Sequence, residues 1–525
     1  STGTENVAVG ALALDAATTA TNNTAIGYNA GTEITTGSEN TILGSSALDA
    51  LTTGSNNTAL GYRALTLAST SSNNTAVGKD ALLLNTTGAQ NVAVGAYALD
   101  ANTTADHNNA VGYYALGANT TGAYNNAFGR GALVTNTTSN NNNAFGDYTL
   151  QANTTGTESS AFGHRALYST TTGGYNNAFG AFALYANTTG AANCAFGAYA
   201  LNAATTASNN TAMGSEALRN CTTGDYNNAF GVNALDGAVT GSYNNAFGQN
   251  ALGANTSGHR NTALGQDSLQ ANTTGAENTA VGNSALAQNT TGNQNTAVGG
   301  NCLDECTTGV ENTAVGYGAA NNLTTANYNT AIGYNASRDL TTGNSNTTLG
   351  INAGLNLSTG TNNLILGTNS GRSTAPSGVI NDESNIVCLG DNSISSIFCA
   401  DTSISSSDQR DKTDVTNFTV GLKWIEALRP VTYRWDKRTW YGTNEEPYGT
   451  PDGSKKRDQL HIGFLAQEML AVEQANGYGT KREDSLITLN NLDEMSYGIK
   501  YERLVPILVN AIKELSAKVT ALEAA

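Results

Sequence analysis

The sequence predicts a mainly β fold, a parallel β-solenoid or β-roll shaft of 17-residue repeats, followed by an α/β (α+β) domain that ends in a coiled-coil helix. Three observations predict it. Glycine recurs every 17 residues from Gly10 to Gly367, which gives 22 registers. An apolar residue precedes each of these glycines, and Leu stands fourth after most of them. After residue 400 the repeat is absent, and this last part holds 16 of the 24 Lys and Arg residues and all three Trp.

The repeat unit is too short for two helices. Its consensus, well represented from Gln249 to Gly265, has two apolar anchors and glycines at positions 10 and 17. A fixed period of this kind is typical of stacked structural repeats. Two short strands and two tight turns fit into such a unit. We therefore expect one solenoid coil per repeat, with both apolar positions in its core.

A column of asparagines accompanies the glycine period. Asn stands four residues before each period glycine from Asn6 to Asn363, with Ser159 as the one interruption. In stacked coils an amide can donate to the copy on one side and accept from the copy on the other. The Asn-Thr-Thr run of many repeats should form similar ladders at the opposite turn. Asn-Thr-Thr is also a glycosylation sequon, which is the alternative interpretation.

The cysteines follow the repeat and show no zinc or redox spacing. Four of them replace small residues within columns, namely Cys194, Cys221, Cys302 and Cys306; Cys388 and Cys399 lie beyond the repeats. Cys221 and Cys306 share a phase but are five coils apart, roughly 24 Å at strand spacing, which is beyond disulfide reach. We expect structural thiols, with pairing between symmetry-related chains as the alternative.

Charge and hydropathy exclude several classes of function. The net charge of -17 is spread thinly, so we expect no nucleic-acid binding, because phosphates would be repelled. No stretch approaches 18 continuous apolar residues, and Ser1 opens neither a charged n-region nor an apolar h-region, so we expect no membrane insertion and no targeting segment in this sequence. No cofactor or metal motif is present, and we expect neither.

Proline and spacing indicate the domain boundaries. Pro376 is the only proline before residue 430, and it lies where the glycine spacing first stretches, from Gly367 to Gly390. We expect a repeat shaft over 1–367, an irregular capping coil and linker over 368–402, and a separate domain over 403–525 with a terminal helix over 503–525.

The glycine-terminated strands resemble a known repeat. Asn312-Thr-Ala-Val-Gly316, followed by Tyr-Gly-Ala, is similar to the head repeats of trimeric autotransporter adhesins. That resemblance covers residues 1 to about 367. It implies a left-handed parallel β-roll in which three chains pack side by side.

Four segments after residue 400 carry a second resemblance. Ser407-Asp-Gln-Arg-Asp-Lys412, Leu428-Arg-Pro-Val-Thr-Tyr-Arg-Trp435, Gly463-Phe-Leu-Ala-Gln-Glu468 and a terminal helix occur in this order. Together they resemble the endosialidase-type intramolecular chaperone, the self-cleaving C-terminal domain of many phage tail fibres and spikes. The resemblance implies a cut of the Ser406-Ser407 bond.

Self-cleavage needs a nucleophile and a base. A serine hydroxyl is weak at neutral pH, and a lysine whose pKa is depressed by burial or nearby cations can take its proton. Ser407 and Lys412 fit this Ser-Lys arrangement. Asp408 and Arg410 are candidates for positioning the loop or polarising the scissile carbonyl; a solvated charge cluster is the alternative.

The last segment has the spacing of a coiled-coil seam. Its apolar residues follow a 3-4-3-4-3 pattern at Val505, Leu508, Ile512, Leu515, Val519 and Leu522. A helix lying on its own domain would show similar spacing over so few turns. We favour a bundle between chains, and three copies agree with both resemblances.

These features together predict a homotrimeric fibre of the phage tail-fibre or virion-spike type, attached through its N-terminal side to another fibre or baseplate protein. A bacterial surface adhesin and an ice-binding solenoid are the alternatives. Exposed Tyr and Asn columns could bind a host-surface glycan or other receptor. The candidates are Tyr124, Tyr175, Tyr226 and Tyr243; the alternative is that Tyr shields the next coil and that Phe, frequent before the period glycines here, only thickens the core.

Overall fold

The computed structural model describes residues 2–375, 377–394, 415–438, 441, 449–481, 484–490 and 497–524, without the side chains of 489 and 490. It contains two compact units, Ser1–Asn312 and Thr313–Ala525. This division falls inside the repeat region, so both units contain coils of the repeat.

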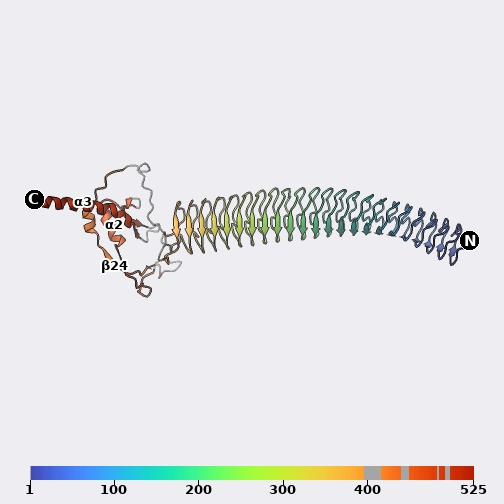
Figure 1. Ribbon diagram of the computed structural model, residues 1–525, viewed down its shortest axis with the longest axis horizontal. Helices are drawn as coiled ribbons and strands as arrows, with labels where there is room; N and C mark the ends of the chain where they lie inside the picture. Colours follow the sequence, from blue (N-terminus) through green and yellow to red (C-terminus); the bar gives the residue numbers. More distant parts are fainter. Residues whose placement is uncertain are drawn as a thin grey trace. The chain divides into compact units, whose positions relative to one another are not determined.

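The first unit is a parallel β-solenoid in which each coil contributes one three-residue strand to a sheet (Figure 1). Each strand pairs in parallel with the equivalent strand 17 residues away. The strands are β1 Val7–Val9, β2 Thr24–Ile26, β3 Thr41–Leu43, β4 Thr58–Leu60, β5 Thr75–Val77, β6 Val92–Val94, β7 Asn109–Val111, β8 Asn126–Phe128, β9 Asn143–Phe145, β10 Ser160–Phe162, β11 Asn177–Phe179, β12 Cys194–Phe196, β13 Thr211–Met213, β14 Asn228–Phe230, β15 Asn245–Phe247, β16 Thr262–Leu264, β17 Thr279–Val281 and β18 Thr296–Val298. The predicted parallel solenoid is confirmed.

The prediction of two strands per coil is wrong, because the rest of each coil consists of turns. These turns still hydrogen-bond from coil to coil. The backbone N–H of Leu116 donates to the carbonyl oxygen of Ala132 at 3.0 Å. On the far side of the same coil, Thr120 donates to Thr137 at 2.9 Å. The coil therefore satisfies its backbone polar groups along most of its length without a second strand.

The interior of the coil is narrow, and small or apolar side chains and buried amides fill it in columns. The middle residue of each strand, usually Ala, points inward, together with the Leu at the fourth position after the period glycine and the Asn before the strand. Ala127, Leu116 and Asn125 are examples, each fully buried. The apolar residue before the glycine points outward instead; Leu43 is 48% exposed and Met213 is 42% exposed. The prediction that this residue is a core position is therefore wrong for the single chain.

The middle residue of the strand and the fourth residue after the period glycine compensate for each other in size. In the coil before β3 the inward strand residue is Ile42 instead of Ala, and Gly31 stands where Leu is usual. A Cβ on Gly31 would lie 2.7 Å from the Ile42 Cδ1 atom. Gly354 and Ile365 repeat the exchange. The strand's middle residue and the fourth residue after the glycine therefore fill one space.

The period glycine has a steric cause. Gly112 has φ +139°, and a Cβ there would lie 2.5 Å from the carbonyl oxygen of Gly129 in the next coil. Both the backbone conformation and the close approach exclude a side chain. Because every coil meets the next in this way, glycine recurs at every register.

The asparagine ladder is confirmed. The side-chain oxygen of Asn261 accepts from the backbone N–H of Asn278 at 3.0 Å and from its side-chain amide at 3.2 Å. The Asn278 amide also donates to the carbonyl oxygen of Gly292 at 2.8 Å. Each buried amide thus links its own coil to its neighbours.

The second ladder at the opposite turn is also confirmed. Asn119 donates to Asn102 at 3.0 Å and Asn136 donates to Asn119 at 2.9 Å. The neighbouring Thr120 hydroxyl donates to the carbonyl oxygen of Thr137 at 3.0 Å. These Asn side chains are fully buried. The glycosylation alternative does not fit them, because a buried amide is inaccessible in the folded chain.

The side chains of Cys221, Cys302 and Cys306 are fully buried. Loss of solvation raises the pKa of each of these thiols to about 12. Cys221 replaces a ladder Asn, and its Sγ lies 3.6 Å from the Gly224 carbonyl oxygen, the type of group to which that Asn donates. Cys194 differs, because it is half-buried and begins strand β12. The expectation of structural thiols holds for the three buried ones.

The second unit begins with further coils. Their strands are β19 Thr313–Val315, β20 Thr330–Ile332, β21 Thr347–Leu349, β22 Leu364–Leu366 and β23 Val387–Leu389. β23 pairs with β22 across a longer connection, with Leu366 opposite Leu389. A smaller α/β region follows, with α1 Leu422–Ala427, β24 Val431–Tyr433, β25 His461–Gly463, α2 Ala466–Gln474, β26 Thr488–Asn490, β27 Tyr497–Ile499, the 3-10 helix η4 Tyr501–Arg503 and α3 Leu504–Glu523. The predicted terminal helix is confirmed.

Candidate functional site

The C-terminal α/β region brings two of the predicted motif segments side by side. Strand β24 comes from the segment 428–435 and pairs antiparallel with β25, which leads into the segment 463–468. Beside this pair the Arg429 guanidinium forms an ion pair with the Glu468 carboxylate at the start of α2. This hydrogen bond and the Glu468 charge raise the pKa of Arg429. Two segments that are separate in the sequence thus form one local structure.

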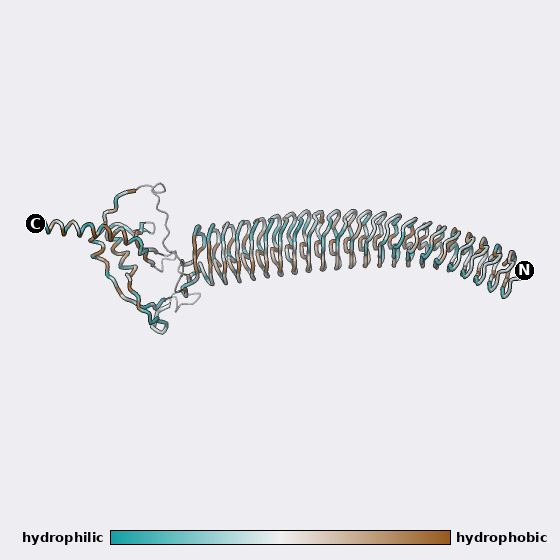
Figure 2. Tube along the Cα trace, viewed as in Figure 1, coloured by the Kyte–Doolittle hydropathy of each residue, from teal (hydrophilic) through white to brown (hydrophobic). Residues whose placement is uncertain are grey.

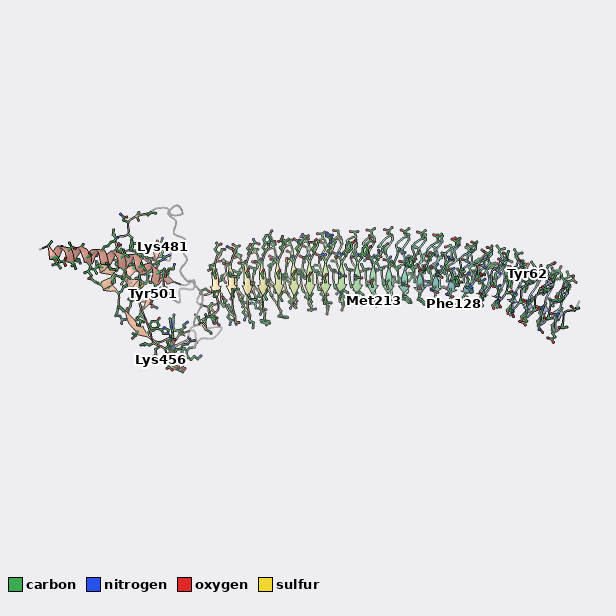
Figure 3. The ribbon with its side chains drawn as sticks, in the orientation of Figure 1. Tyr62, Phe128, Met213, Lys456, Lys481 and Tyr501 are labelled. Carbon is green, nitrogen blue, oxygen red and sulfur yellow. The ribbon has the colours of Figure 1, made fainter. Side chains whose placement is uncertain are left out.

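Aromatic rings cover the β24–β25 pair. Tyr433 stacks on His461 with ring centroids 5.5 Å apart, and Trp435 meets Tyr433 edge-on at 5.2 Å. The Tyr501 hydroxyl accepts from the backbone N–H of Phe464 at 3.1 Å; Figure 3 labels Tyr501. His461 therefore lies in an aromatic packing environment.

The hydrophobic core of the C-terminal α/β region contains side chains from helices at both ends of this region. Trp424 of α1, Met469 of α2 and Leu504 and Ile507 of α3 are buried together with Ile487. The packing fixes α1 against α3, and the Asn510 side-chain amide donates to the Phe418 carbonyl oxygen at 2.8 Å. The last helix therefore belongs to the fold of its own chain.

Helix α3 also carries a second apolar stripe that its own chain leaves exposed. The buried face consists of Leu504, Ile507 and Ala511. The predicted seam residues lie elsewhere on the helix and are 42–77% exposed: Val505, Leu508, Ile512, Leu515, Val519 and Leu522. From Ile512 to Ala524 every side chain is exposed. Packing on its own domain therefore does not account for the seam.

The predicted nucleophile and its neighbours lie outside the described residues. These are Ser406, Ser407, Asp408, Arg410 and Lys412. Their assignment as a cleavage site and a Ser-Lys pair stays a prediction. Among the residues that the structure describes, no group of three or more His, Cys, Asp or Glu side chains could hold a metal ion.

The second candidate surface is the outer face of the solenoid sheet. The first and third residues of each strand are half-buried or exposed and so point outward, as in β8, β9 and β13. Figure 2 shows hydrophobic segments recurring at the same place in successive coils. Seven of the eight strands from β8 to β15 end in Phe, and the eighth ends in Met213. Figure 3 labels Phe128 and Met213 on this column. We call the outward-facing first and third residues of β1–β18 the sheet face.

The phenylalanines of the sheet face stack upon one another. From Phe128 to Phe196, and between Phe230 and Phe247, adjacent ring centroids are 4.5–4.8 Å apart and the planes differ by 3–9°. The alternative in which Phe thickens the core of its own coil is therefore wrong. Each inner ring uses both faces on its neighbours and presents only its edge outward.

The four tyrosines predicted to bind glycans lie at the turn before the strand. Each has a positive φ of 56–64° and is 48–57% exposed. Tyr226 and Tyr243 stack on each other with centroids 5.1 Å apart, while Tyr124 stacks on His107 at 4.8 Å. The Tyr175 hydroxyl lies 3.4 Å from Glu158 Oε1. The structure brings together only Tyr226 and Tyr243, and glycan binding stays a prediction.

Sequence reasoning missed the sheet face because it assigned the large apolar residue to the core. A signal was present in the sequence. Most repeats combine Leu at the fourth position after the glycine with Ala in the middle of the strand, whereas one repeat combines Gly31 with Ile42 at these two positions. Residues that exchange volume fill a common space, and the residue before the glycine takes no part in this exchange. It therefore could have been placed outside.

No helix among the described residues has the length and apolar character needed to span a bilayer.

Comparison with known proteins locates one family. Residues 407–478 match the family model described as chaperone of endosialidase. A search of curated proteins found no match. The matched segment contains α1, β24, β25 and α2, and the two motif segments that pair in the structure lie within it. The C-terminal part of this chain thus matches the endosialidase-chaperone family, and it follows a parallel β-solenoid of 17-residue repeats.

Proposed function

We propose that this chain is a homotrimeric fibre or spike subunit that attaches to a host-cell surface. In this proposal the C-terminal region is an intramolecular chaperone that aligns three chains and then cuts itself off at Ser406-Ser407. The observation that carries the proposal is the match of residues 407–478 to the endosialidase-chaperone family directly after a uniform solenoid. The fibre would belong to a virion tail or spike.

A uniform solenoid gives a reason for such a chaperone. Three chains of nearly identical coils that slip by one repeat keep most of their contacts, so correct and slipped assemblies differ little in free energy. A compact domain that joins three chain ends in phase supplies the missing alignment. The exposed seam of α3 is suited to that task, because apolar residues at this spacing pack between helices.

The proposed cut is an acyl transfer followed by hydrolysis. The Ser407 hydroxyl attacks the Ser406 carbonyl carbon, and Lys412 accepts the hydroxyl proton. The peptide C–N bond breaks, the Ser407 nitrogen leaves as an amine, and an ester forms between the two serines. Water then hydrolyses the ester and leaves a Ser406 carboxylate and a free N-terminal Ser407. Release of the alignment domain makes the assembled shaft kinetically trapped, since it loses its folding nucleus.

Mass analysis of freshly expressed chain tests the cleavage. Wild type should yield a fragment that begins at Ser407, and Ser407→Ala should yield only intact chain. Ser405→Ala is the matched control, and it should cleave like wild type. A fragment from the Ser407→Ala chain, or none from wild type, would overturn the proposed cut.

A second experiment tests alignment through α3. In the uncleaved Ser407→Ala chain, Ile512→Asp places a charge in the exposed seam and should shift the sedimenting species from trimer to monomer. Lys513→Ala changes the next, exposed residue and should leave the trimer intact. An unchanged trimer in Ile512→Asp would remove the seam from the assembly.

A further inference from the structure

The sheet face carries no charge, and it differs from the other uncharged surface of the coil, the Thr-Thr turn, in presenting a large apolar residue in every coil. Among strands β1 to β18, the first residue is Thr, Asn, Val, Ser or Cys and the third is Val, Ile, Leu, Phe or Met. The third residues are half-buried or exposed in every coil, for example Val9 at 55% and Leu264 at 49%. A contiguous apolar surface that repeats along so many coils is typical of an interface.

Charges lie on the outward columns that flank the strands. Arg130 pairs with Asp147 at 2.8 Å just after the strands, and Arg260 pairs with Glu277 at 3.3 Å just before them. The chain as a whole has a net charge of -17. Two copies therefore repel each other at most approaches, and the sheet face is an apolar surface on which they can meet without desolvating charges.

The geometry of the phenylalanines favours a protein partner over a sugar. A sugar ring stacks on the face of an aromatic ring. The faces of Phe145, Phe162 and Phe179 are each covered by two neighbouring rings at 4.6–4.8 Å, or 4.5 Å for the Phe179–Phe196 pair. Only their edges point outward, and a row of ring edges packs well against another apolar row.

We infer that the sheet face is the contact between copies of this chain, parallel and in register around a threefold axis. The inference rests on the proposed trimer and adds which face forms it. A second copy of this chain has the same spacing between coils as the sheet face. Each strand of one copy can therefore lie opposite the equivalent strand of the other. A parallel arrangement also keeps the C-terminal helices of the copies at the same end.

The composition of the sheet face marks the register. Phe occurs only in the strands from β8 to β15, with smaller aliphatic residues on both sides and Met213 as a single interruption. Where the third residue is Phe, the first residue is Asn, Ser or Cys and never Thr or Val. A slip by one coil would place Phe edges against Val111 or Leu264 at the ends of this block and against Met213 within it. The block thus adds a small preference for the correct register to the alignment that the C-terminal region supplies.

Cys194 provides the experiment, because it lies on the sheet face as the first residue of β12. The thiols of Cys221, Cys302 and Cys306 are buried. In a Cys399→Ser background, a short bis-maleimide should link Cys194 between chains into covalent dimers. The control moves the thiol to the opposite turn of the same coil by Cys194→Ser with Thr189→Cys, where the side chain is exposed.

Sedimentation of the same samples separates the possible outcomes. A trimer that cross-links through Cys194 and not through the Thr189→Cys thiol supports the inference. A trimer that cross-links at the opposite turn, or at neither site, overturns the sheet face as the interface and leaves the proposed trimer standing. A monomer overturns both.

A charge on the face is the second test. Phe179→Arg should abolish the trimer, because the side chain points outward and the charge would be buried between copies. Thr189→Arg, on the opposite side, should keep it. A trimer that tolerates Phe179→Arg would contradict the inference.

Discussion

Asn278 joins three coils through one side chain. Its amide donates to Asn261 and to the Gly292 carbonyl oxygen, and its own oxygen accepts from the backbone and side chain of Asn295 at 2.9 and 3.2 Å. All of these groups are buried. A buried polar group that loses its partner costs about 1–3 kcal/mol. The ladder is therefore stable only as long as it is continuous.

The Asn278→Ala variant should for this reason destabilise the shaft by about 2–4 kcal/mol, since it leaves several buried groups unpaired. Asn283→Ala is the matched control, because its side chain is exposed, and it should change stability by less than about 0.5 kcal/mol. Chemical denaturation followed by far-UV circular dichroism measures both. Equal midpoints for the two variants would contradict the ladder's role.

Asp100 makes the shaft sensitive to pH. Loss of solvation raises the pKa of its half-buried carboxyl to about 6, and the Asp80 charge acts in the same direction. An unfolded Asp has a pKa of about 3.9. Between these two values the folded chain binds the proton more tightly than the unfolded chain, so stability should fall as the pH rises from about 4 to about 6.

The Asp100→Asn variant should lack this part of the fall. Thermal unfolding midpoints at pH 4 and pH 7 should differ less in the variant than in wild type, with the gain in the variant appearing at pH 7. Asp236 and Asp304 also have pKa values raised by burial, so some fall remains. Parallel pH profiles for variant and wild type would refute the assignment to Asp100.

At the scale of the element, the coil depends on backbone conformations that most residues avoid. In a typical coil, Tyr114, Leu116 and Tyr124 all have φ between 51° and 60°. A left-handed residue other than Gly costs roughly 1–2 kcal/mol. Full burial of a Leu contributes roughly 1.5–3 kcal/mol, and the coil-to-coil hydrogen bonds of the turn add to it. The element is thus stable only within a stack.

Helix α2 depends on one buried carboxylate. Glu473 is fully buried and accepts hydrogen bonds from the backbone N–H groups of Ile487 and Thr488 and from the hydroxyls of Ser485 and Thr488. All four partners are groups that can donate a hydrogen bond, and the two carboxyl oxygens of Glu473 accept from them. This carboxylate connects α2 to the start of β26.

The Glu473→Gln variant should destabilise the C-terminal region by about 2–3 kcal/mol, because an amide group would face donors. Glu468→Gln on the same helix is the matched control; its ion pair with Arg429 is exposed and should be worth less than about 1 kcal/mol. Near-UV circular dichroism of the buried Trp424 during urea unfolding would measure both. A larger loss in Glu468→Gln than in Glu473→Gln would contradict this account.

At the scale of the whole molecule, the proposed cut means that the region needed for assembly is removed before the finished fibre has to remain stable. Alignment would be supplied by a region that the finished fibre no longer contains. The shaft would then persist because unfolding is slow and not because refolding is possible.

Refolding should therefore depend on the C-terminal region. Uncleaved Ser407→Ala chain, unfolded in guanidinium and diluted, should recover trimers. Shaft isolated after cleavage should give aggregates or monomers under the same conditions. Sedimentation and far-UV circular dichroism measure the recovery, and equal recovery from both samples would show that the shaft aligns itself.

The sequence by itself determined the period, the parallel stacking, the two Asn ladders and the terminal helix. These follow from local rules. Gly112 recurs because a side chain would collide with the next coil, and Asn278 recurs because a buried amide needs identical neighbours. Repetition turned single-residue preferences into a pattern that one chain displays 22 times.

Only the tertiary structure decided which side of the strand faces inward. The usual rule places the large apolar residue inside, but the coil is so narrow that Ala127 and Leu116 fill it and Phe128 is left outside. The tertiary structure also decided that Glu473 is buried and that the second apolar stripe of α3 is exposed, because burial depends on segments that are distant in the sequence. A pattern of hydropathy names the residues that avoid water, whereas the space available among neighbouring segments decides which of them a single chain can bury.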